Sequence, residues 1–120
     1  MNLLHPTLGD LIDRAVILDL KQLATGRFAD ELAEVEGAIL RKRSGIPVDV
    51  LDELRKSLRF VHRQIWNINV QFSHLHQLDA DLRVPNHLGL AAWRLNQNRI
   101  EILEHIDTLN GEHVRPEKVY

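Results

Sequence analysis

Residues 51–75 read LDELRKSLRFVHRQIWNINVQFSHL, and this stretch decides the fold. Its apolar residues recur at alternating spacings of three and four: Leu51, Leu54, Leu58, Val61, Ile65, Ile68, Phe72 and Leu75. This spacing is the heptad pattern of a helix that packs along one seam. Because no glycine or proline interrupts the pattern before Pro85, we predict one helix from Val50 to Leu78.

Such a helix would be a rod of roughly 45 Å, at about 1.5 Å per residue. A compact domain of 120 residues is usually narrower than that. The rod is therefore expected either to project from the domain or to be covered by a partner.

A first helix is predicted to begin at Thr7, which is followed three residues later by Asp10 in the arrangement of a capping box. It should run to about Thr25, where Gly26 offers a left-handed end. The run Ala15–Leu18 is apolar on all sides, so this helix is expected to be covered on more than one face.

Two further helices complete the prediction, one from Phe28 to about Arg43 and one from about His87 to Leu109. The earlier one carries a stripe of the small residues Ala29, Ala33 and Gly37, where another backbone could approach. The later one repeats the seam spacing with Leu88, Ala92, Leu95, Ile102, Ile106 and Leu109. Arg99 occupies a seam position that should be apolar.

We therefore predict an all-α protein: an elongated helical bundle of about four helices with a long central heptad-patterned helix. Residues 1–120 would form a single domain, with a turn near Pro85 and an extended C-terminal tail at residues 112–120. The scarcity of aromatic residues, 5% of the chain, favours helices over a β-sandwich or barrel.

Composition excludes several classes of protein. The net charge of −2 gives no indication of a nucleic-acid partner, and the absence of cysteine excludes disulfides and thiolate chemistry. Since there is no signal peptide and no apolar run of about 20 residues, we expect a cytoplasmic protein without a membrane partner.

Polar residues interrupt the apolar faces of the two longest predicted helices. If these helices pack antiparallel, Trp66, Asn69, Asn96 and Arg99 would converge. Such a cluster either fixes the register of the helices as a satisfied network or binds a polar ligand. The structural network is the interpretation we favour from sequence.

Arg55, Arg59 and Arg63 recur every four residues on the long helix. They could hold phosphates, but we favour salt bridges, because the preceding helix offers Asp30, Glu31, Glu34 and Glu36.

Neither a metal site nor a catalytic centre is predicted. His76 and Asp79 make a weak metal pair, and His74 points to another face. The carboxylates of Asp10, Asp13 and Asp19 lack acidic partners on the long helix, where Asn69 and Val70 stand instead. We therefore expect no catalytic residues, no bound metal and no cofactor.

Several short motifs occur in order along the chain. They are Asp13-Arg14 with Ile17-Leu18 and Lys21, then Ile65-Trp66-x-Ile68, then Asn96-x-x-Arg99, and finally Glu117-Lys118-x-Tyr120. In this combination the chain resembles a pair of related bacterial families of small all-helical domains of unknown function, often encoded near glycosyltransferases.

The resemblance implies a role beside cell-surface polysaccharide synthesis. The families typically carry an acidic pair shortly after the tryptophan, where this chain has Asn69 and Val70. An activity that depended on that pair would be lost or altered here. The positions that match the families are Asp13, Arg14, Lys21, Trp66, Asn96 and Arg99.

Two functions follow as hypotheses. The first, which we favour from sequence, is a non-enzymatic interaction or structural module that forms a homo-oligomer, most simply a dimer, or binds another protein. The second is a binding protein or enzyme for a phosphorylated ligand such as a nucleotide sugar. Its ligand-binding residues would be Asp13, Arg14, Lys21, Trp66, Asn69, Asn96 and Arg99. An open pocket would favour the second hypothesis, and a closed core would favour a structural cluster.

Overall fold

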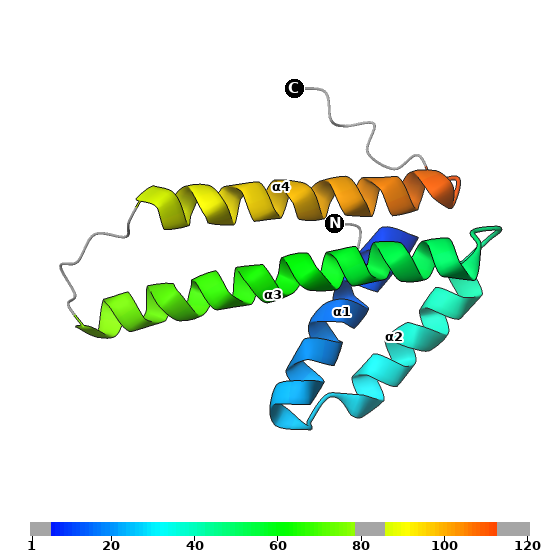
Figure 1. Cartoon of the computed structure of the whole chain (residues 1–120). Helices are drawn as coiled ribbons and strands as arrows, with labels where there is room; N and C mark the ends of the chain where they lie inside the picture. The colour runs from blue at the N-terminus through cyan, green and yellow to red at the C-terminus, as the bar shows by residue number, and fades with distance from the viewer. Residues whose placement is uncertain (1–5, 79–85, 113–120) are drawn as a thin grey trace.

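The computed structural model describes residues 6–78 and 86–112, and within these ranges it contains helices and no strand. The helices are α1 (Leu8–Thr25), α2 (Ala29–Lys42), α3 (Val48–Leu78) and α4 (Asn86–Leu109) (Figure 1). The predicted all-α class is confirmed. The turn near Pro85 and the tail beyond Glu112 lie outside the described residues.

The start of α1 is fixed by side chains from two directions. Thr7 Oγ1 accepts from the backbone N–H of Asp10, and the Asp10 carboxylate accepts from the N–H of Thr7, so the predicted capping box is confirmed. The N–H of Gly9 donates to Asp107 at 2.7 Å, and that of Leu8 donates to Glu112 at 2.8 Å. Carboxylates from the last turn of α4 and from Glu112, just after that helix, thus accept from first-turn donors of α1 and stabilise the positive end of its dipole.

The ends of α2 and α4 are also joined. The side chain of Asn110 accepts from the N–H of Ser44 at 2.9 Å and donates to the carbonyl of Lys42 at 3.3 Å. Lys42 forms a salt bridge with Glu112 at 3.2 Å. These contacts hold the end of α2 against the end of α4.

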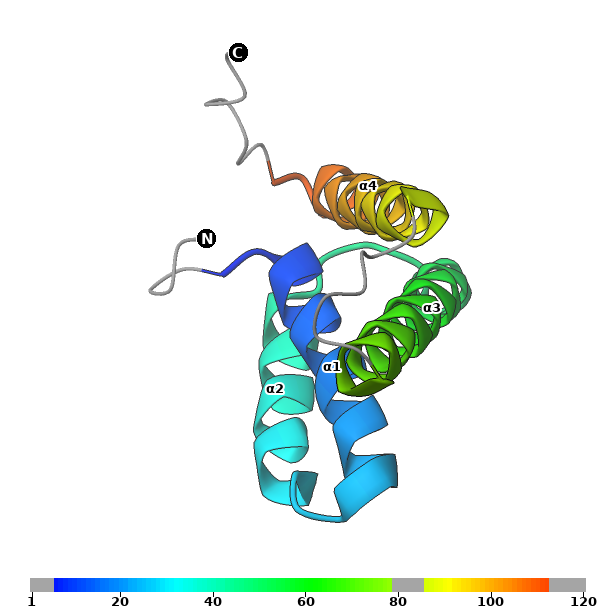
Figure 2. The same cartoon turned by 90° about the vertical axis from the view of Figure 1, so that its left-hand side faces the viewer.

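The four helices form two antiparallel pairs that cross. α3 and α4 lie side by side and run in opposite directions, and α1 with α2 forms a second pair across one end of the first (Figures 1 and 2). α1 packs against each of the three other helices. The expectation that it is covered on more than one face is confirmed, and its residues Leu8, Ile12, Ala15 and Val16 are almost fully buried.

The heptad seam of α3 faces the core as predicted. Leu51, Leu58, Val61 and Ile68 are buried, and Leu54 is half-buried against the same core. The side chains of Phe72 and Leu75 lie outside the described ones.

The small-residue stripe of α2 does not serve as a close contact between helices. A Cβ built at Gly37 would meet only the side chain of Arg41, one turn further along the same helix. The stripe therefore gives no closer approach to another helix in this chain.

α3 projects beyond the crossing with α1. With 31 residues, α3 extends past the α1–α2 pair. The second half of α3 and the first half of α4 therefore project together as a two-helix arm (Figure 1). The radius of gyration of 16.3 Å exceeds the value of about 14 Å expected for a compact domain of this length, and the molecule measures 50 × 40 × 28 Å. The predicted elongation is confirmed, and the rod projects.

The arginine stripe of α3 is used mainly for ion pairs within the chain. Arg55 forks onto Glu36 of α2, and Arg59 pairs with Asp19 of α1. Arg63 is exposed and forms no salt bridge with a described residue. The salt-bridge interpretation is confirmed for Arg55 and Arg59, although the partner of Arg59 lies on α1 rather than α2.

Among the described helices, none has the length and apolar content needed to cross a bilayer.

Candidate functional site

A pocket of about 540 Å³ opens where α1 crosses α3 beside α4. Its volume falls in the range of roughly 300–1,000 Å³ that is typical of small-molecule sites. Three helices supply its walls. The lining residues are Ile17, Leu20 and Lys21 from α1, His62, Ile65, Trp66, Asn69, Val70 and Ser73 from α3, and Asn96 and Arg99 from α4.

Five of the seven candidate ligand-binding residues line this pocket: Lys21, Trp66, Asn69, Asn96 and Arg99. Asp13 lies behind the pocket wall, where its carboxylate contacts two of the lining residues. Arg14 is not part of the group. It is exposed and pairs with Glu31 of α2 at 2.6 Å.

Asp13 is the anchor of the polar wall. One carboxylate oxygen of Asp13 lies 2.6 Å from Nε2 of His62 and accepts from Nε of Arg99 at 3.1 Å. The other oxygen accepts from Nη2 of Arg99 at 2.8 Å. This fork fixes the plane of the guanidinium, and it joins α1, α3 and α4 through one side chain that is 10% exposed.

The charges of this cluster stabilise one another. Burial raises the pKa of Asp13, but its hydrogen bonds and charge interactions with His62 and Arg99 outweigh that effect, and the pKa lies below its ordinary value. The hydrogen bond to Asp13 raises the pKa of Arg99 above its ordinary value. Asp13 therefore stays ionised at neutral pH and is a poor general base.

Arg99 keeps donors that can face a ligand. A guanidinium has five N–H donors, and Arg99 uses three of them on described residues, two on Asp13 and one, from Nη1, on the side-chain oxygen of Asn96 at 3.2 Å. That oxygen of Asn96 is engaged by Arg99, and the side chain of Asn96 is exposed and lines the pocket.

Lys21 adds a second cationic residue to the pocket lining, from α1. Its ammonium lies 5.6 Å from the centre of the Phe28 ring and forms no salt bridge with a described carboxylate. A cation over an aromatic face is held in place without being neutralised. Two residues that line the pocket are therefore cationic: Lys21 on α1, whose ammonium lies over Phe28, and Arg99 on α4, which Asp13 partly neutralises.

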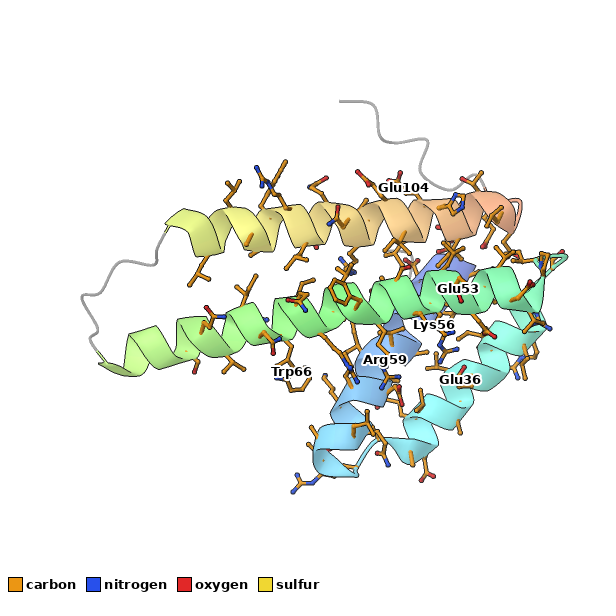
Figure 3. The ribbon with its side chains drawn as sticks, in the orientation of Figure 1. Glu36, Glu53, Lys56, Arg59, Trp66 and Glu104 are labelled. Atoms are coloured by element: carbon orange, nitrogen blue, oxygen red, sulfur yellow. The ribbon has the colours of Figure 1, made fainter. Side chains whose placement is uncertain are left out.

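The remaining wall is apolar and carries one aromatic ring. The side chains of Ile17, Leu20, Ile65 and Val70 line the pocket beside Trp66. Trp66 is 42% exposed and points away from α4, on the side of α3 that α1 crosses (Figure 3). An exposed indole at a pocket wall offers a flat face for stacking.

Sequence reasoning left His62 and Ser73 out of the candidate set, although a second stripe on α3 would have found them. His62, Trp66, Asn69 and Ser73 follow one another at spacings of four, three and four. They therefore occupy one face of the helix beside the apolar seam. The apolar seam marks the core-facing side of α3, whereas these four residues form a parallel stripe that lines the pocket.

Within the described ranges no group of three or more histidine, aspartate or glutamate side chains is placed to hold a metal ion. The side chains of His74 and His76, together with Asp79, lie outside the described residues. The described lining of the pocket combines two cationic side chains, two amides and one exposed indole ring.

No family model matches the chain, and neither the curated proteins nor the solved structures include a match. The resemblance found in the sequence accordingly stays a prediction.

Proposed function

We propose that this chain is a binding protein for a phosphorylated organic ligand that carries a flat ring, of which a nucleotide sugar is one representative. The observation that carries the proposal is the open pocket between α1, α3 and α4, which is lined by Lys21, Trp66 and Arg99. A closed core at these residues would have favoured a purely structural cluster.

The cationic part of the pocket wall suits the phosphate of such a ligand, and the part with the indole ring suits its flat ring. Lys21 and the free edge of Arg99 suit a phosphate, because an ammonium supplies a point charge and a guanidinium supplies parallel donors. Trp66 suits a base or a sugar ring, and Asn69 and Asn96 supply amides for hydroxyl or carbonyl groups. Asp13 acts through Arg99 as a positioning residue.

A thermal-shift screen tests the proposal. A ligand at about 100 times its dissociation constant adds about 2.7 kcal/mol of stability. For a domain of 120 residues this raises Tm by about 10 °C. The panel should contain nucleoside monophosphates, nucleotide sugars and sugar phosphates, with unphosphorylated nucleosides and inorganic phosphate as controls. We expect a shift with compounds that have both a ring and a phosphate.

Two lysine variants with the same change in net charge separate pocket binding from general attraction of anions. Lys21→Gln should abolish most of the shift, whereas Lys56→Gln should preserve it, since Lys56 is exposed on α3 and pairs with Glu53. A folded protein that gives no shift with any phosphorylated ring compound would overturn the proposal, as would equal losses in both variants.

Self-association, the hypothesis favoured from sequence, is retained as a second proposal because the far part of the α3–α4 arm extends beyond α1 and α2 (Figure 1). Binding to a different protein, a cytoplasmic location and a bacterial source also remain predictions.

A further inference from the structure

The α3–α4 arm consists of residues 64–78 of α3 and residues 86–98 of α4. Residues 64–78 include no aspartate, glutamate, lysine or arginine, and residues 86–98 include one, Arg94. At the chain's average of 27% charged residues, about four would be expected in the first segment alone. A projecting surface helix normally carries charge on its solvent face, so the arm has the composition of a covered element.

The arm also exposes the two tryptophans of the chain. Trp93 is 60% exposed and Trp66 is 42% exposed, with Leu90 and Val70 beside them at 49% and 42%. Aromatic enrichment together with depletion of charge is the compositional mark of the centre of a protein–protein interface.

We propose that a second copy of this chain covers the arm. Two such arms packed face to face along a two-fold axis would form a four-helix bundle, the arrangement in which antiparallel helix pairs bury their apolar sides. A surface that meets its own copy must avoid placing like charges opposite each other. The described pocket side of the arm meets this requirement, because Asn69, Val70, Ser73 and Asn96 are all neutral.

The dimer would also close the pocket. Asn69, Val70 and Ser73 line the pocket and continue along α3 into the arm, so a copy packed on the arm would lie over the open side. Each ligand would then be held between two chains and shielded from water. This closure rests on the proposed function, whereas self-association does not.

The test measures oligomeric state by sedimentation velocity and light scattering from micromolar to submillimolar protein, with the full chain. Trp93→Glu and Val70→Glu each place a charge on the exposed arm, and Leu40→Glu places the same charge on α2, where Leu40 is 68% exposed. We expect a wild-type dimer, unchanged by Leu40→Glu, with a dimer dissociation constant raised at least about tenfold by each arm variant. Circular dichroism verifies that each variant is folded.

A monomeric wild type over this range would overturn the inference, and so would a dimer that persists unchanged in both arm variants. The ligand proposal is judged separately. Since Trp93 does not line the pocket, a folded monomeric Trp93→Glu protein should still bind the ligand, with lower affinity. A wild type that dimerises through the arm but binds no ligand would leave this inference standing and remove the proposed function.

Discussion

Replacing Asp13 by asparagine is expected to destabilise the fold more than any change to a surface ion pair. Asp13→Asn keeps the shape and one oxygen acceptor, but it places an NH₂ group against either Nη2 of Arg99 or Nε2 of His62, which are now 2.8 and 2.6 Å from its oxygens. Breaking a buried ion pair typically costs about 3–5 kcal/mol. Because the side chain of Arg99 is 29% exposed and can turn to solvent, we expect about 2–4 kcal/mol here.

The stabilisation that the Asp13 carboxylate provides is expected to depend on pH. Folding lowers the pKa of Asp13 from its ordinary value of 3.8, so the stabilisation is complete above that value and is lost as the pH falls through the lower folded value. The difference in the free energy of unfolding between wild type and Asp13→Asn should therefore be full at neutral pH and should shrink below about pH 4.

Urea denaturation followed by circular dichroism at a series of pH values measures both effects. Asp52→Asn is the matched control, because Asp52 is an exposed aspartate on α3, and it should change stability by less than about 0.5 kcal/mol. The account of Asp13 would be refuted by a loss at neutral pH no larger than that of the control, or by a loss that stays constant into acid.

Three other substitutions, the last with a matched control, test separate parts of the fold by the same measurement. Gly9→Ala should cost about 2–3 kcal/mol, because its Cβ would lie 2.7 Å from a carboxylate oxygen of Asp107; a neutral result would contradict the close approach of α1 to α4. Thr7→Ala should cost about 1 kcal/mol through the lost cap, and no cost would argue against the capping box. Arg55→Gln should lower the free energy of unfolding by less than about 1 kcal/mol, and high salt should remove this difference. Its control, Arg63→Gln, should have no measurable effect on stability. Equal losses in the two variants would contradict a stabilising ion pair at Arg55.

Much of the fold could be predicted because its determinants are local. The spacing of Leu51, Leu58 and Val61 sets the buried face of α3, and Thr7 with Gly26 sets the ends of α1. Periodicity and caps act over a few residues, so a sequence shows them directly.

The crossing of the two helix pairs could not be predicted in the same way. It depends on contacts between distant residues, such as that of Gly9 with Asp107. A stripe of small residues predicts where a backbone could approach, but not whether another helix is placed there, as the position of Gly37 shows.

The candidate site was predictable only in part, for a related reason. Arg99 in the apolar seam, with Asn96 one turn away, indicated a polar cluster between the helices. The partner of Arg99 is 86 positions away, and neither spacing nor composition identifies Asp13 as that partner. Arg14, adjacent to Asp13 in sequence, points to α2 instead, because successive residues of a helix face different directions.

The central claim, that the α1–α3–α4 pocket binds a phosphorylated ligand with a flat ring, is tested most directly by the fluorescence of Trp66. The chain has two tryptophans, so Trp93→Phe leaves Trp66 as the sole indole reporter. Titration of this variant with the ligand found by thermal shift should give a saturable change in emission, and Lys21→Gln should weaken it by at least about tenfold. A Trp66 signal that does not respond, in a folded protein at saturating ligand, would contradict the claim.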